Sequence, residues 1–245
     1  LETLPRRVAL PPALHGAEPW RPGPTRTVFA DPLRGAPGDL DGRDLPGGGA
    51  TWRRTFGRGA LDVGPDGARW RASVAAPLPG RTLYTIAWDD PDFAELEVTL
   101  TPPGTSRGQS EHGTAGFCLW QDDGHHLLVN TWLDDCYGGA SLSSFPTIGG
   151  FEDLYDAIWT NVGDRIAWGR PLRLRLACDG LRYLVHIDDE PVLYRSLADI
   201  YPGCRPLRIR RVGLLGNWEW GADTGTAFAD FAARRRDGSR ADDAR

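Results

Sequence analysis

The chain lacks both lysine and methionine, and it has no long apolar run. The missing residue types indicate a coding bias, because no chemistry requires their absence. No apolar stretch approaches the roughly 20 residues of a membrane-spanning helix, which excludes such a span. Acidic residues outnumber basic ones, since the chain has 33 Asp and Glu and 28 scattered Arg, and the net charge is −5. We therefore expect neither a nucleic acid nor a membrane as a partner.

Cysteine is also scarce, whereas tryptophan is abundant. The four cysteines follow no metal-binding spacing, and we interpret Cys118 and Cys178 as small buried apolar side chains. Core packing accounts for some of the ten Trp. Trp is also the usual stacking platform for sugar rings, so this count keeps carbohydrate among the candidate ligands.

The stretch 115–135 predicts a central β-hairpin. Two apolar runs are joined by Asp123-Gly124, a dipeptide that supplies the positive φ angles of a two-residue type I′ turn. Because neither face would be polar, the hairpin belongs at the centre of a sheet, with one face in a core and the other covered or lining a cleft. The register implied by this turn pairs Phe117 with Asn130, Cys118 with Val129, and Trp120 with Leu127.

A second hairpin follows near residue 179. Apolar residues alternate in 172–177 and in 183–187, and both strands agree on which face is buried. A two-residue turn at Asp179-Gly180 would pair Arg175 with Leu184 and Arg173 with His186 on the opposite face.

Further short strands are predicted by apolar alternation between turns rich in Gly, Pro and Asp. In 93–100, for example, Leu96 and Val98 point inward while Glu95 and Glu97 point outward. Almost no helical pattern is present, so the fold class is all-β, an antiparallel two-sheet β-sandwich of the jelly-roll type. The other predicted strands are 28–30, 51–56, 61–63, 68–74, 83–88, 192–194, 207–215 and 226–233.

Three regions are expected along the chain. Residues 1–27 are rich in proline and predict an extended arm or linker, whereas 28–234 predict the sandwich and 235–245 a charged, disordered tail. Inside the sandwich, 134–169 predict one long aromatic-rich insertion folded over one end, with 151–159 as a short helix.

Both ends of the predicted sandwich resemble known sequences. The opening reads FADPLRG from Phe29, then LDGR and ATWRRTFGRGALDVGPDGARWRA; the ending reads RVGLLGNWEWGADTGTAFADF. This pattern resembles the concanavalin A-like lectin/glucanase superfamily in its laminin-G-like form, over about 28–234. The resemblance implies a jelly roll whose first and last strands lie side by side, and a glycan bound on the concave face of one sheet. It also implies an extracellular or secreted location, although no signal peptide is visible in the sequence given.

The candidate ligand-binding residues are aromatic, amide and acidic side chains that suit a sugar. Asn130, Trp132 and Asp134 share one face of their strand, and the run 217–219 ends another strand. Packing alone also explains such residues, so the two interpretations stand side by side. The ligand-binding candidates are Asn130, Trp132, Asp134, Tyr137, Tyr155, Trp159, Asn217, Trp218 and Glu219.

Candidate catalytic residues are less distinctive. Glu95 and Glu97 share one strand face at a separation that suits a carboxylate pair in a glycosidase, and Arg175 with His186 would suit a polysaccharide lyase. A solvated outer face explains all four equally simply. No hydrolase Glu-x-Asp-x-x-Glu strand and no alginate-lyase block is present, so fold alone does not give an activity.

No cofactor is required by this pattern, but Asp31 and Asp230 could hold a structural Ca²⁺. The sequence favours a carbohydrate-binding β-sandwich that recognises a poly- or oligosaccharide. The alternatives are a glycoside hydrolase or polysaccharide lyase with an atypical active site, and a non-catalytic interaction domain.

Overall fold

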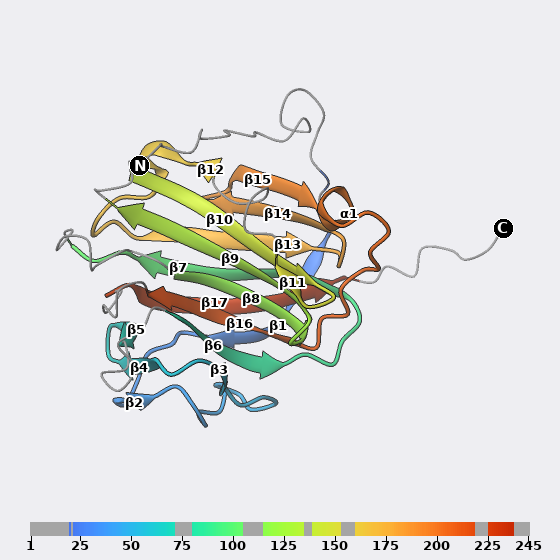
Figure 1. Cartoon of the computed structure of the whole chain (residues 1–245). Helices are drawn as coiled ribbons and strands as arrows, with labels where there is room; N and C mark the ends of the chain where they lie inside the picture. Colours follow the sequence, from blue (N-terminus) through green and yellow to red (C-terminus); the bar gives the residue numbers. More distant parts are fainter. Residues whose placement is uncertain are drawn as a thin grey trace.

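The computed structural model describes residues 20, 22–71, 80–104, 115–134, 139–152, 160–218 and 225–237. These residues form two antiparallel sheets, with one short α-helix, α1 (Leu197–Ile200), and one 3-10 turn, η2 (Gly163–Arg165) (Figure 1). The predicted fold class, an all-β two-sheet sandwich, is confirmed. Among the described helices, none is long and apolar enough to cross a membrane.

The first sheet contains nine strands, with β1 (Thr25–Asp31) paired to the strand β17. The remaining order is β15 (Glu190–Ser196), β14 (Arg182–Ile187), β13 (Leu172–Cys178), β7 (Phe93–Thr101), β17 (Ala227–Arg236), β5 (Gly67–Arg71), β4 (Ala60–Gly64) and β2 (Gly38–Asp39).

The second sheet contains eight strands, with β12 (Thr160–Asn161) paired to the strand β10. The remaining order is β11 (Phe151–Glu152), β10 (Gly139–Ile148), β9 (His125–Asp134), β8 (Ala115–Asp122), β16 (Arg211–Trp218), β6 (Gly80–Ala87) and β3 (Arg53–Phe56). We call this the eight-stranded sheet and the other the nine-stranded sheet.

Alternate residues of both sheets form the core between them. In β7, Leu96, Val98 and Leu100 are fully buried, as the alternation predicts, and Phe117 and Leu119 of β8 meet them from the other sheet. Each buried side chain of this size contributes about 1.5–3 kcal/mol through the hydrophobic effect. The core therefore dictates which residues of each strand remain for the outer faces.

The two ends of the described chain lie side by side, because β1 pairs with β17 and Asp31 lies opposite Phe231. This confirms the predicted neighbourhood of the first and last strands. The buried Asp31 carboxylate accepts hydrogen bonds from Leu33 N at 2.7 Å and Trp52 Nε1 at 2.9 Å. Upstream of β1, the Trp20 ring lies against the Arg182 guanidinium at 5.0 Å.

The central hairpin forms as predicted, but its predicted register is wrong. The turn pairs Asp122 with His125 as expected, and a bulge at Gln121 then shifts the pairing by one residue. A one-residue shift turns one strand over relative to the other. The observed pairs are therefore Phe117 with Val129, Cys118 with Leu128, and Trp120 with His126, rather than Phe117 with Asn130, Cys118 with Val129, and Trp120 with Leu127.

The second hairpin keeps its predicted faces but not its predicted register. Cys178 pairs with Tyr183, so the loop holds four residues instead of two, and Asp179 Oδ1 accepts hydrogen bonds from the amides of Leu181 and Arg182. The shift is two residues, which preserves the buried face. Arg175 consequently lies opposite His186 instead of Leu184.

The predicted insertion 134–169 is only partly a connection. Its first half contributes the ten-residue strand β10, which pairs with β9 along most of its length. Phe151 and Glu152 form the short strand β11, where a helix over 151–159 was expected. Residues 153–159 lie outside the described part of the chain. The strand predicted at 207–215 begins later, at Arg211.

The eight-stranded sheet is strongly curved. Arg81 of β6 forms a two-point ion pair with Glu152 of β11, at 2.6 Å and 2.9 Å, although the two strands are five positions apart in the sheet. In a flat sheet five spacings would separate them by roughly 24 Å. Two side chains do not span that distance, so the face that carries Arg81 and Glu152 is concave.

Candidate functional site

The candidate site lies on the concave face of the eight-stranded sheet, turned away from the nine-stranded sheet. Leu127 and Val129 of β9 belong to the core between the sheets, so the alternate residues Leu128, Asn130 and Trp132 lie on the concave face. In the sheet, Asn130 stands between Gly116 of β8 and Ser143 of β10. We call Asn130, Trp132 and Ser143 the Asn130 cluster.

Two polar side chains of this cluster, Asn130 and Ser143, lack partners within the described part of the chain. Both are 0% exposed, and neither the amide atoms of Asn130 nor Oγ of Ser143 has a hydrogen-bond partner there. Each buried polar group left without a partner costs about 1–3 kcal/mol. Such groups are rare in folded proteins and therefore call for a reason, of which ligand binding is one.

The residues on either side of Asn130 in the sheet are small. Gly116, on the same face, has no side chain, and a Cβ there would stand 1.8 Å from the carbonyl oxygen of Val129. Only glycine fits at this approach of β8 to β9. On the other side Ser143 is small, while Trp132 is 6% exposed and lies opposite Ser141 in β10. The Trp132 ring thus belongs to the next residue pair on the same face as the two buried polar groups of Asn130 and Ser143.

Another part of the concave face is filled with the protein's own side chains. A second apolar cluster occupies it, and the Arg81 guanidinium lies over the Phe145 ring at 4.5 Å while binding Glu152. Burial strongly raises the pKa of the Cys118 thiol within this cluster. The members of the cluster are Leu83, Cys118, Trp120, Leu128, Phe145 and Leu215, with Ile200 packed against them.

His126 packs against this apolar cluster. Its ring stacks on Trp120, with centroids 4.5 Å apart, and its Nδ1 has no hydrogen-bond partner among the described residues. Burial lowers the pKa of His126 below its usual value, which favours the neutral ring. Glu152, the acid that faces it, is held by Arg81, so the described side chains form no pair of free carboxylates on this face.

Several predicted ligand-binding residues cannot be placed. The backbones of Asp134, Asn217 and Trp218 belong to the ends of β9 and β16, but their side chains are outside the description. The remaining ones, Tyr137, Tyr155, Trp159 and Glu219, lie outside the described residues.

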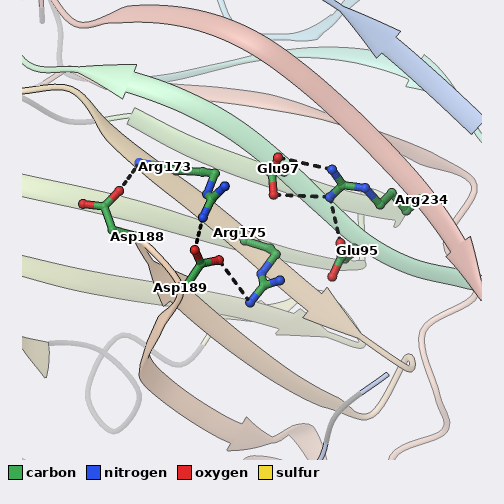
Figure 2. A network of polar contacts seen from close by, with 7 residues as sticks. All are labelled: Glu95, Glu97, Arg173, Arg175, Asp188, Asp189 and Arg234. Atoms are coloured by element: carbon green, nitrogen blue, oxygen red, sulfur yellow. Dashed lines mark hydrogen bonds and ion pairs between the residues drawn. The ribbon is translucent and has the colours of Figure 1, made fainter. Parts of the chain in front are cut away.

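The predicted catalytic residues lie on the other sheet. Glu95 and Glu97 point from β7 toward Arg234 of β17, which binds Glu95 at 2.7 Å and Glu97 at 3.2 Å (Figure 2). Burial alone would lower the pKa of Arg234, but the hydrogen bonds and charges of Glu97 and Glu95 raise it above its usual value. We call Glu95, Glu97 and Arg234 the β7–β17 ion-pair cluster.

Arg175 and His186 stand beside that cluster, opposite each other in β13 and β14. Glu97 lies opposite Arg175 on the other side, so the four predicted catalytic residues do share one face. The turn residues Asp188 and Asp189, both with positive φ, bind Arg173, and Asp189 also reaches Arg175 at 3.9 Å (Figure 2). This face is separated from the Asn130 cluster by the thickness of the sandwich, about 10 Å between sheets.

The two predicted calcium ligands each have partners within the protein. Both oxygens of Asp31 already accept hydrogen bonds inside the protein, whereas Asp230 is exposed and lies 3.6 Å from Arg34. Among the described residues no group of three or more His, Cys, Asp or Glu could hold a metal ion.

Sequence reasoning missed Ser143, His126 and the pair Arg81–Glu152. For Ser143 the pattern SLSSFPT over 141–147 holds a weak signal, because Ser141 and Ser143 alternate with Leu142. The pair Arg81–Glu152 has no sequence signal, since it depends on the curvature of the sheet.

No protein-family model and no curated protein matches the chain. Solved structures do match it. An apo Crh5 transglycosylase aligns over 87% of this chain and 85% of that chain, at 16% identity and a TM-score of 0.52. The carbohydrate binding module CBM66 from Bacillus subtilis aligns over 76% and 92%, at 14% identity and 0.47. A Bacillus subtilis protein of unknown function with a galectin-like fold aligns over 87% and 100%, at 13% identity and 0.48. At these identities the transglycosylase match shows a shared β-sandwich fold alone.

Proposed function

We propose that the protein is a carbohydrate-binding β-sandwich and that the Asn130 cluster binds the sugar. The observation that carries the proposal is the buried Asn130 amide and Ser143 hydroxyl, which have no partners and lie next to Trp132. The amide nitrogen needs an acceptor, the amide oxygen needs a donor, and the hydroxyl can use either. Neighbouring sugar hydroxyls offer donors and acceptors together, whereas an anion offers only acceptors and a metal cation only an electron-pair acceptor.

The geometry of the concave face favours a short ligand. Part of this face is filled by the second apolar cluster and closed by Arg81 and Glu152. A long polysaccharide therefore has no path across the whole face, whereas a mono- or disaccharide end needs only the part beside Trp132. Because Asn130 and Ser143 are fully buried, this part of the face must open before the sugar binds.

Binding is favoured over catalysis because the described residues bring no free carboxylate pair, and no tyrosine or arginine pair, beside Trp132. Glu152 is bound to Arg81, and Glu95 with Glu97 is bound to Arg234 on the opposite sheet. An extracellular location is part of the same proposal, since glycans of this kind are most available there.

The test is Asn130→Leu, measured for stability and for binding to a panel of neutral and acidic mono- and oligosaccharides. We expect binding to be lost and the free protein to become more stable by about 1–3 kcal/mol, because an amide without partners is removed. Thr131→Val is the matched control, since Thr131 is the next residue, is equally buried, and its hydroxyl donates to Ala115 O at 2.9 Å. That variant should lose stability and keep binding.

Product formation on the same panel separates the alternatives. New reducing ends, or the ultraviolet absorbance of unsaturated uronides, would replace the proposal with a hydrolase or a lyase. If Asn130→Leu bound every sugar that the native protein binds, the Asn130 cluster would not be the site.

A further inference from the structure

A pocket of about 470 Å³ opens at one end of the sandwich, away from the Asn130 cluster. It lies where β6, β13 and β17 end and where β7 and β16 begin, so both sheets contribute to it (Figure 1). Arg210, which lines the pocket, lies just before β16. Leu215 comes five residues later in that strand and pairs with Gly116, the residue beside Asn130. The two sites thus occupy different parts of the molecule.

The walls of this end pocket are fixed by backbone hydrogen bonds. The amide of Trp88 donates to Arg210 O at 2.7 Å, that of Leu207 to Gly180 O at 2.8 Å, and that of Arg236 to Asp92 O at 2.8 Å. These bonds join segments from both sheets. The pocket is therefore preformed, and a ligand would not have to order a loop to use it.

The charges around the end pocket do not balance. Its acids Asp90 and Asp179 are bound to Arg235 at 2.6 Å and to Arg182 at 2.7 Å, neither of which lines it. Its three arginines, Arg208, Arg210 and Arg236, have side chains in no ion pair within the described part of the chain, and only Asp89 is left to oppose them. An excess of two positive charges thus gathers here, in a protein whose net charge is −5.

Two residues that line the end pocket also carry a buried donor without an acceptor. Trp88 is 1% exposed, and among the described residues neither its Nε1 nor the buried Nε of Arg236 has a hydrogen-bond partner. Indole and guanidinium groups only donate. The unmet demand here is for acceptors alone, unlike that of the Asn130 cluster, so a neutral sugar and a metal cation both fit poorly.

We propose that the end pocket binds a doubly charged oxyanion, a phosphate or sulfate group, through Arg208, Arg210 and Arg236. Such groups offer several acceptor oxygens and form the strongest hydrogen bonds with guanidinium donors. Two negative charges match the local excess of two positive charges. The group is either free phosphate or sulfate in solution or a phosphate monoester on a small molecule, and each of these carries close to two negative charges at neutral pH.

The test is calorimetric titration of the whole chain at low salt with inorganic phosphate, inorganic sulfate and glucose 6-phosphate. Saturable binding of at least one of these is expected, and unsubstituted glucose at the same concentration should not bind to the Asn130→Leu variant, which lacks the sugar site. Tighter binding of glucose 6-phosphate than of inorganic phosphate would identify a substituted ligand, and the reverse would identify the free ion. No saturable binding of any of the three anions at millimolar concentration would overturn the proposal.

Variants assign the binding to the end pocket. Arg208 and Arg210 are exposed, and the double variant Arg208→Gln/Arg210→Gln should bind the anion at least tenfold more weakly. The variant Asp89→Asn should bind it more tightly. Arg205→Gln is the matched control, since Arg205 is exposed on the same segment and does not line the end pocket. Equal loss in this control would mean unspecific charge attraction and would refute the site. Asn130→Leu should leave anion binding unchanged, so failure of this proposal and failure of the sugar site are distinguishable.

A second readout does not depend on substituted arginines. The indole N–H resonance of Trp88, assigned through Trp88→Phe, should shift when inorganic phosphate is added, because Trp88 lines the end pocket. A resonance that stays unmoved while the anion saturates the protein would place the anion elsewhere.

Discussion

The β7–β17 ion-pair cluster provides the sharpest test of the structure, through the variant Arg234→Leu. Arg234 is 21% exposed, and its partners Glu95 and Glu97 are 8% and 20% exposed. Removing one partner of a fully buried ion pair costs about 3–5 kcal/mol, because the other charge stays buried and uncompensated. Since a fifth of this cluster still meets water, we expect a loss of about 2–3 kcal/mol.

Arg173→Leu is the matched control, because Arg173 lies on the same face and also binds an aspartate. Arg173 is 44% exposed and its partner Asp189 is 65% exposed, so its removal should cost less than about 1 kcal/mol. Urea denaturation measures both losses, and thermal unfolding should show a fall of roughly 5–10 °C for Arg234→Leu. Equal losses in the two variants would refute the argument from burial. If Glu95→Gln binds glycans as the native protein does, the result would agree with a structural role for this cluster. If the variant loses turnover of a glycan substrate, the result would favour the catalytic alternative.

Three further outcomes are expected. Gly216→Ala should cost about 1–3 kcal/mol in urea denaturation, because a Cβ there would stand 2.2 Å from the buried ring of Trp70; no loss would mean that the ring can move. Burial lowers the pKa of His126, so the folded state binds fewer protons than the unfolded state between its lowered pKa and about 6.5. Stability should therefore fall as the pH drops through this range, and His126→Gln should reduce that fall when stability at neutral pH and at about pH 5 is compared. Burial raises the pKa of the Cys178 thiol to about 12, so an aromatic disulfide reagent should modify it far more slowly than the partly exposed Cys204, and equal rates would contradict this.

The fold was predictable because most strands carry a clear alternation. In β7, for example, Leu96 and Val98 face the core while Glu95 and Glu97 face outward, and the structure confirms both. Strand β10 was missed because four of its ten residues are serine or glycine, which is the composition of a loop. Its serines are nevertheless useful in a sheet, since Ser144 contacts the Tyr183 hydroxyl at 3.0 Å inside the core.

The register of the central hairpin was not predictable from its turn. Asp123-Gly124 fixes the pairing only as far as Asp122 with His125, and the bulge at Gln121 has no sequence signature. Its consequence for the site is large, because it places Cys118 and Trp120 on the same face as Asn130. Phe117 and Leu119, expected beside Asn130, instead lie in the core. Asn130 could be identified as a candidate from the sequence alone, whereas the residues that surround it could be identified only from the structure.

The pairing of β1 with β17 determines how the protein responds to a mechanical load. Thr25, where β1 begins, lies opposite Arg236, where β17 ends, so a force on the two flanking segments pulls across the strands. In this unzipping geometry the hydrogen bonds between the strands break one after another, so each step needs little force. After β1 has peeled away, β17 is still held by β7 on its other edge. Single-molecule stretching should therefore show that β1 detaches at a low force, before the rest of the sandwich unfolds at a higher force.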